Sequence, residues 1–131
     1  MFQISTYADL DEFQKIGYFA KESGIGIDEL ASMVEIDPDL LYRIVKSGSV
    51  SAATPNRGAI YDSLYLLMEL ISYLLAVSNH DSAALRRLWT DVSIYRATLN
   101  KPPWFSFGLK SYLLATKRKG IEAALTWIRE F

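Results

Sequence analysis

The residue pattern between positions 24 and 48 constrains this chain most strongly. Gly26 is a suitable N-cap, and Glu29 three residues later can accept a hydrogen bond from its backbone N–H. The pair Asp37-Pro38 is a second helix start, and Gly48 is a suitable stop. Apolar residues recur at helical spacing in both parts, at Ile27, Leu30, Ala31 and Val34, and at Leu40, Leu41, Ile44 and Val45. The pattern predicts two short helices joined by a tight turn at Glu35 and Ile36.

Two short helices joined by a tight turn are the outline of a helix-turn-helix, which places its second helix in the major groove of DNA. The same pattern also fits an ordinary pair of helices packed into a helical core. Both interpretations stay open from the residues alone.

Helical periodicity continues along the rest of the chain, without an alternation long enough for a strand. We therefore expect an all-α fold, a compact helical bundle with a helix-turn-helix-like element near the N-terminus. The chain divides into a helix-turn-helix-like segment at 1–56 and a helical core with a partner-binding segment at 57–131, within one compact domain. From capping residues such as Asp9 and breakers such as Pro103, we expect helices at 10–23, 27–34, 38–47, 57–78, 81–99, 109–117 and 121–130.

The apolar run at 60–77 is near the shortest length that spans a bilayer. It contains Asp62 and Glu69, and two carboxylates inside a membrane are costly. We therefore interpret the run as a buried bundle helix or a dimer seam and expect no membrane contact. The N-terminus lacks the pattern of a signal peptide, which favours a cytoplasmic protein.

The composition offers little for catalysis or metal binding. The 131 residues include no cysteine and a single histidine, His80, so no Cys/His dyad or thiolate cluster can form. Carboxylates at 9–12 and 35–39 are explained by helix capping. There is no glycine-rich phosphate loop and no serine nucleophile elbow. We expect no enzymatic activity, no metal and no cofactor.

The net charge of −1 conceals a strong asymmetry. Residues 1–50 carry nine acidic and four basic side chains, a net charge of −5. Residues 81–131 carry nine basic and four acidic side chains, a net charge of +5. Such asymmetry affects the choice of partner, and an acidic half opposes attraction to DNA phosphates.

The outward residues of the helix at 38–47 are the candidates for DNA contact. Arg43 can pair with guanine, and Tyr42 and Lys46 can reach bases or phosphates. Ser47 and Ser49 follow at the end of the helix, where we expect them near phosphates. The alternative is a solvated helix face.

A second set of candidates lies in the C-terminal half. The aromatic residues of the loop after Pro103, if exposed, fit an anchor for a protein partner, and if buried they belong to the core. Basic residues nearby fit an acidic protein, nucleic acid or the acidic half of a second copy, or else solvated helix ends. The partner-binding candidates are Trp104, Phe105, Phe107, Lys110, Lys117, Arg118 and Lys119.

The helix pair resembles the Xre-type, phage-repressor-like helix-turn-helix at Glu29-Leu30-Ala31, Ile36-Asp37, Leu40 and Ile44. The C-terminal part is similar to the toxin-binding domain of Xre-like antitoxins, at residues 97–100, Gly108, 113–116, Gly120 and 124–125. The resemblance implies a helical module that blocks a partner toxin, often one that acts on NAD.

We therefore expect a small DNA-binding regulator or antitoxin-like protein. It would contact operator DNA as a homodimer and neutralise a toxin-like protein partner. The alternative is a protein-only interaction module, such as a phage or plasmid accessory protein or an immunity-like factor. Such a module keeps the helix-turn-helix as a scaffold without binding DNA, and the acidic first half favours it.

Overall fold

The computed structural model describes residues 10–90, 102, 104 and 108–130, and these residues form helices and connecting turns without any strand. This confirms the all-α fold. The described helices are α2 (Gln14–Ser23), α3 (Ile27–Val34), α4 (Pro38–Ser47), α5 (Arg57–Val77), α6 (Ser82–Thr90) and α7 (Leu109–Glu130).

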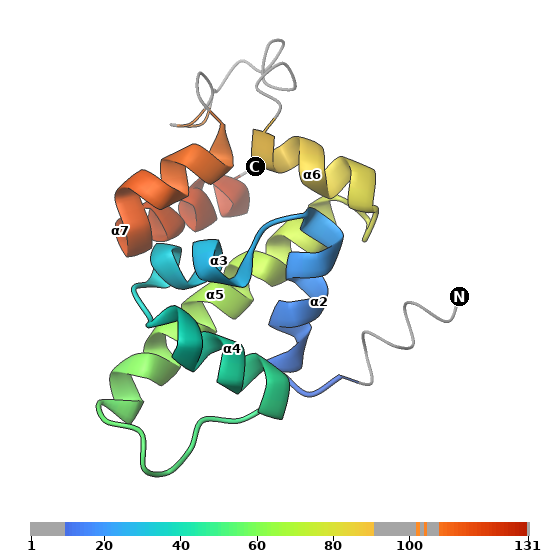
Figure 1. Cartoon of the computed structure of the whole chain (residues 1–131). Coiled ribbons are helices and arrows are strands. Elements are labelled where there is room, and N and C mark those ends of the chain that lie inside the picture. Colours follow the sequence, from blue (N-terminus) through green and yellow to red (C-terminus); the bar gives the residue numbers. More distant parts are fainter. Residues whose placement is uncertain (1–9, 91–101, 103, 105–107, 131) are drawn as a thin grey trace.

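The long helix α5 runs diagonally through the molecule, with α2, α3 and α4 on one side of it (Figure 1). Helices α6 and α7 lie in the upper half of this view. Helix α3 packs against α4, α5 and α7, and α2 packs against α4 and α6. Leu64, Leu67 and Leu70 of α5 are fully buried, as are Leu30 and Met33 of α3. Each such side chain stabilises the fold by about 1.5–3 kcal/mol through removal from water.

The predicted caps of α3 and α4 are confirmed. The backbone N–H of Gly26 donates to Glu29 Oε1 at 3.1 Å, and the backbone N–H of Leu40 donates to Asp37 Oδ2 at 3.1 Å. Helix α4 ends at Gly48, whose φ of 84° is left-handed. The turn between the two helices is made by a left-handed Glu35 (φ 58°) followed by buried Ile36. The use of this pair as a helix-turn-helix stays a prediction.

Helix α2 begins later than expected. Its first residue is Gln14 rather than Leu10, and the expected cap, Asp9, lies outside the described residues. Asp11 takes that place, because its carbonyl accepts from Gln14 N at 3.0 Å and its N–H donates to Gln14 Oε1 at 3.2 Å. The predicted stop at Gly24 (φ 75°) is confirmed.

Helix α5 ends one residue before the expected position, where Asn79 and His80 adopt left-handed backbones at φ 54° and 57°. The Asp81 carboxylate accepts from Ala84 N at 3.0 Å and therefore caps α6, at the start expected for the helix at 81–99. Residues 91–99 of the helix expected at 81–99 lie outside the described residues.

By length and composition, α5 alone among the described helices is able to cross a membrane. In the structure it packs against α2, α3, α6 and α7. This packing buries one of its faces, which consists of Ser63, Leu64, Leu67, Leu70, Ile71, Leu74 and Leu75.

The sequence predicts two helices at 109–117 and 121–130, and therefore a turn between them. The turn is correctly placed but shorter than expected, because Lys117 alone leaves the helical conformation, at φ 59° and ψ −137°. The second half of α7 folds back beside the first (Figure 1). The φ and ψ of Lys117 are strained for a residue with a side chain.

We predict that a Lys117→Gly variant is more stable than a Lys117→Ala variant by about 1 kcal/mol, because glycine relieves the backbone strain. Both variants lose the hydrogen bond that the Lys117 amine donates to Ser32 Oγ, so their difference isolates the backbone. Urea denaturation provides the measurement. The matched pair at helical, exposed Lys119 should show the opposite order, with Ala more stable than Gly. Equal stability of the two Lys117 variants would contradict strain at this residue.

Candidate nucleic-acid interface on α4

One face of α4 packs against the rest of the protein, and the opposite face is exposed to solvent. Leu41 and Ile44 are buried, at 0% and 2% exposure, where α4 packs against α2 and α3. Tyr42 is 58% exposed, and Arg43 and Lys46 are also exposed. Figure 1 shows α4 in the lower half of the molecule, above the loop 48–56. The outward face predicted from the sequence is therefore accessible.

The structure divides the five predicted DNA-contact residues between two flanks of α4. Arg43, Ser47 and Ser49 border a groove between α4 and the loop 48–56. Tyr42 and Lys46 border a different hollow, between α4 and α2. The two flanks together form one continuous outer surface of the helix, since residues three and four apart are neighbours on a helix.

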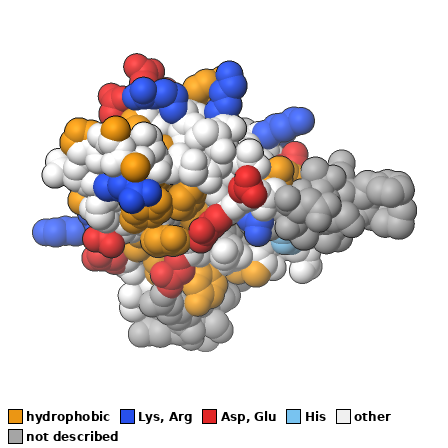
Figure 2. All heavy atoms as spheres, turned by 90° about the horizontal axis from the view of Figure 1, so that it is seen from below, with side chains coloured by type: hydrophobic (Ala, Val, Ile, Leu, Met, Phe, Trp, Pro, Cys, Tyr) orange, Lys and Arg blue, Asp and Glu red, His pale blue; other side chains and the backbone are white. Residues whose placement is uncertain are grey.

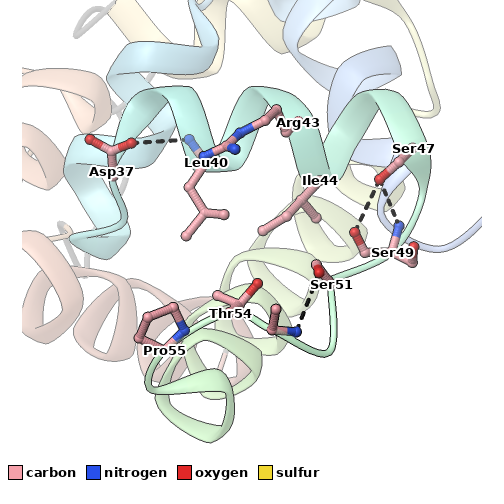
Figure 3. Close-up of a pocket in the computed structure, with 10 residues that line it drawn as sticks. Asp37, Leu40, Arg43, Ile44, Ser47, Ser49, Ser51, Thr54 and Pro55 are labelled. Carbon is pink, nitrogen blue, oxygen red and sulfur yellow. Dashed lines mark hydrogen bonds between the residues drawn. The ribbon is translucent and has the colours of Figure 1, made fainter.

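The groove beside the loop has a volume of about 600 Å³. Leu40 and Ile44 point from α4 toward the loop, where Thr54 and Pro55 form the opposite wall (Figure 3). Asp37 borders the same groove. The groove therefore combines an apolar floor with both an acidic and a basic side chain.

The serine hydroxyls of the loop are engaged locally. Ser47 Oγ donates to the Ser49 carbonyl at 3.1 Å and lies 3.4 Å from Ser49 N (Figure 3). Ser51 Oγ accepts from Ala53 N at 3.3 Å. These bonds stabilise the local turns of the chain that follow α4. The Ser47 hydroxyl must release the Ser49 carbonyl before it can donate to a phosphate.

The surface around α4 is mixed in charge. Between residues 35 and 57 there are three acidic side chains, Glu35, Asp37 and Asp39, and three basic ones, Arg43, Lys46 and Arg57. Figure 2 shows side chains of both signs on the face of the molecule seen from below, with apolar side chains between them. Phosphate attraction from this region is therefore partly cancelled.

Sequence reasoning missed two basic residues near this surface. Lys21 of α2 borders the same hollow as Tyr42 and Lys46. The Arg57 guanidinium donates to the Val50 carbonyl at 3.4 Å and lies 5.2 Å from the centre of the Tyr61 ring. Neither belongs to the α4 pattern, and only the packing of α2 and the path of the loop bring them close to it.

Of the two alternatives for the aromatic loop, the structure places Trp104 in the core, so this residue is not an exposed anchor. Trp104 is 1% exposed, and its ring packs 5.7 Å from Tyr112 and 5.4 Å from Trp127. A large aromatic side chain gains most by such burial, so Trp104 is a core residue. Phe105 and Phe107 lie outside the described residues.

Two of the predicted partner-binding lysines hold α7 against α3. Lys110 Nζ lies 2.9 Å from Glu29 Oε2, and the Lys117 amine donates to Ser32 Oγ. Arg118 is half-buried and borders a hollow of about 270 Å³ together with Glu35. Lys119 is exposed. The basic residues of α7 thus include two that are engaged within the molecule.

Within the described ranges, no three His, Asp or Glu side chains come together to hold a metal ion. His80 is exposed at the turn between α5 and α6. The expectations of no metal, no cofactor and no catalysis stay predictions.

Comparisons of this chain with protein-family models, with curated proteins and with solved structures find no match. The functional interpretation therefore rests on the residues and their geometry.

The Glu29 carboxylate provides a test of the contact between α3 and α7. The bond with Lys110 and then the bond from the Gly26 N–H lower the pKa of Glu29 below its ordinary value of 4.5. A lowered pKa in the folded state means that the stabilisation is present above pH 4.5 and is lost as pH falls below that value. Because Glu29 and Lys110 are each about a third exposed, the effect is screened by solvent.

We predict that Glu29→Gln lowers the melting temperature at pH 7, and that this difference narrows as pH falls below the ordinary glutamate pKa. Thermal unfolding followed by circular dichroism measures it. Glu122→Gln, at an exposed position of α7, is the matched control and should leave the melting temperature unchanged. A difference between Glu29→Gln and the natural protein that stays constant down to pH 3 would contradict the role of the ionised carboxylate.

Proposed function

We propose that this protein is a small DNA-contacting regulator in which α4 is the helix presented to the duplex. One observation carries the proposal: α4 is fixed by buried Leu41 and Ile44, while Tyr42, Arg43 and Lys46 on its outer face are exposed. The resemblance to the Xre-type helix-turn-helix supports the same function.

The anchoring of α4 matters because base recognition requires side chains to start from a fixed backbone. Asp37 caps the first turn and left-handed Gly48 ends the last one, so both ends of the helix are fixed. From this backbone, the fork of Arg43 can donate two hydrogen bonds to a guanine edge. Lys46 and Tyr42 can donate to phosphates on the other flank.

The same face carries one residue that opposes DNA. Asp39 is exposed one turn before Arg43, and its carbonyl accepts from Arg43 Nε at 3.4 Å. Its carboxylate repels phosphates near the helix. In our proposal a homodimer offsets this weak electrostatic attraction by presenting two copies of α4 to two half-sites.

The antitoxin part of the proposal concerns the basic C-terminal half. Its net charge of +5 suits an acidic surface on a toxin-like protein, with exposed Lys119 and half-buried Arg118 as contacts. We propose a cytoplasmic, non-enzymatic role, in which α4 contacts DNA and α7 contacts the protein partner.

A second function, a protein-only interaction module, is favoured by the groove beside α4. Its floor of Leu40 and Ile44 is apolar, and its charged residues, Asp37 and Arg43, have opposite signs. A peptide segment of mixed polarity fits such a groove better than a polyanion does. In this function α4 is a scaffold helix.

We predict that the double variant Arg43→Ala/Lys46→Ala loses DNA binding, measured by fluorescence anisotropy with duplexes selected from a random-sequence library. For the natural protein, the logarithm of the association constant should fall linearly with the logarithm of salt concentration between about 50 and 200 mM. Arg118→Ala/Lys119→Ala, which removes the same charge from α7, is the matched control and should retain binding. Tight binding by the first double variant would refute α4 as the contact helix.

Removing the opposing charge should have the reverse effect. We predict that Asp39→Asn strengthens DNA binding at about 50 mM salt, because one repulsive carboxylate leaves the interface, and that the gain shrinks as salt screens it. The same anisotropy titration measures it. Asp62→Asn, at an exposed position of α5, is the control. An unchanged affinity for Asp39→Asn would place the duplex away from this turn of α4.

A further inference from the structure

A hollow borders α4 on the side that faces α2. Its volume is about 470 Å³. Its walls include Gly17, Ala20 and Lys21 from α2, and Tyr42, Val45 and Lys46 from α4. It is therefore a cleft between two helices, one of which carries the proposed DNA contacts.

The packing of α2 against α4 explains why two lysines meet at this hollow. A Cβ atom at Gly17 would lie only 2.8 Å from Val45 Cγ1, so the absence of a side chain at Gly17 allows the helices to approach closely. Lys21 follows Gly17 by one helical turn, and Lys46 follows Val45 directly. The close approach of the helices therefore brings Lys21 and Lys46, both exposed, to the same hollow.

Charge distinguishes this hollow from two others that border α4. The groove beside the loop includes Asp37 with Arg43, and the smaller hollow near α7 includes Glu35 and Asp37 with Arg118. The hollow between α2 and α4 has only Lys21 and Lys46 as charged residues in its walls. Of these three surfaces, it is the one that suits a polyanion.

We propose that the hollow between α2 and α4 receives one strand of the sugar–phosphate backbone, and that Lys21 is a second phosphate contact beside Lys46. This inference rests on the proposed function and adds a contact from a different helix. A helix in the major groove has phosphate strands along its sides. Helix α2 packs against α4 on the flank that carries Lys46, so Lys21 lies on the side of α4 where such a strand would run. The exposed Tyr42 hydroxyl can donate to the same strand, and the apolar floor faces its sugars.

This arrangement separates two roles on the two flanks of α4. Lys21 and Lys46 contribute to affinity for any sequence, because an ammonium group attracts phosphates without reading bases. Arg43, on the opposite flank, carries sequence preference through its planar fork. Removal of Lys21 should therefore weaken binding to all duplexes by the same factor.

The test compares Lys21→Ala with Lys21→Arg, using anisotropy titrations of selected and scrambled duplexes at several salt concentrations. The salt slope is the slope of the logarithm of the association constant against the logarithm of salt concentration. We expect that Lys21→Ala makes this slope less steep by about 1. The ratio of the association constants for selected and scrambled duplexes should stay unchanged. Lys21→Arg, which keeps the charge, should retain the natural slope. Arg87→Ala removes one charge from α6, at the opposite end of the molecule from α4, and should also retain it (Figure 1).

A stability measurement separates this contact from a structural role. Lys21 lies in the last turn of α2, where a positive charge also interacts favourably with the helix dipole. That interaction changes the melting temperature but not the salt slope of DNA binding. A natural slope for Lys21→Ala, with binding lost in Arg43→Ala/Lys46→Ala, would overturn this inference and leave the proposed function in place. Absence of DNA binding by the natural protein would overturn both.

Discussion

The packing of α3 into the core holds the neighbouring helices in place. Leu30, Ala31, Met33 and Val34 all have no exposed surface, although α3 is only eight residues long. So short a helix is not stable alone in water, and its conformation is maintained by packing against α4, α5 and α7. In turn, α3 sets the position of α4 through a three-residue turn and that of α7 through Glu29 and Ser32. The surface that α4 presents is therefore a consequence of the core beneath it.

Local chemistry was enough to predict most of the helices. The ends of α3 and α4 follow from Gly26, Asp37, Pro38 and Gly48, because each of these residues acts through its own backbone or its neighbours three or four positions away. The predicted start of α2 is wrong because of a similarly local interaction. Asp11 and Gln14 form a reciprocal turn that a pattern based on acidic caps does not anticipate.

The candidate site was only partly predictable. The exposure of Tyr42, Arg43 and Lys46 follows from helical spacing, but Lys21 joins them only because Gly17 lets α2 approach Val45. Burial of Trp104 likewise depends on rings eight and twenty-three residues away, at Tyr112 and Trp127. Such relations arise from tertiary packing, which periodicity in one segment does not reveal.

The balance of charge determines how this surface can work. Three acidic and three basic residues between positions 35 and 57 give no net attraction to a polyanion, so binding depends on where the charges lie. Concentration of Lys21 and Lys46 on one flank provides a local positive surface within an acidic half of the chain. This reconciles the proposed DNA contact with the net charge of −5 over residues 1–50.

The most direct measurement is an NMR titration of the natural protein with duplex DNA, following the backbone amide signals at low and at high salt. If α4 is the contact helix, the shifts concentrate in residues 39–47 of α4 and around Lys21, and they disappear at high salt. Shifts confined to α7, or no shifts at low salt, would contradict the assignment of α4 as a DNA-contacting helix.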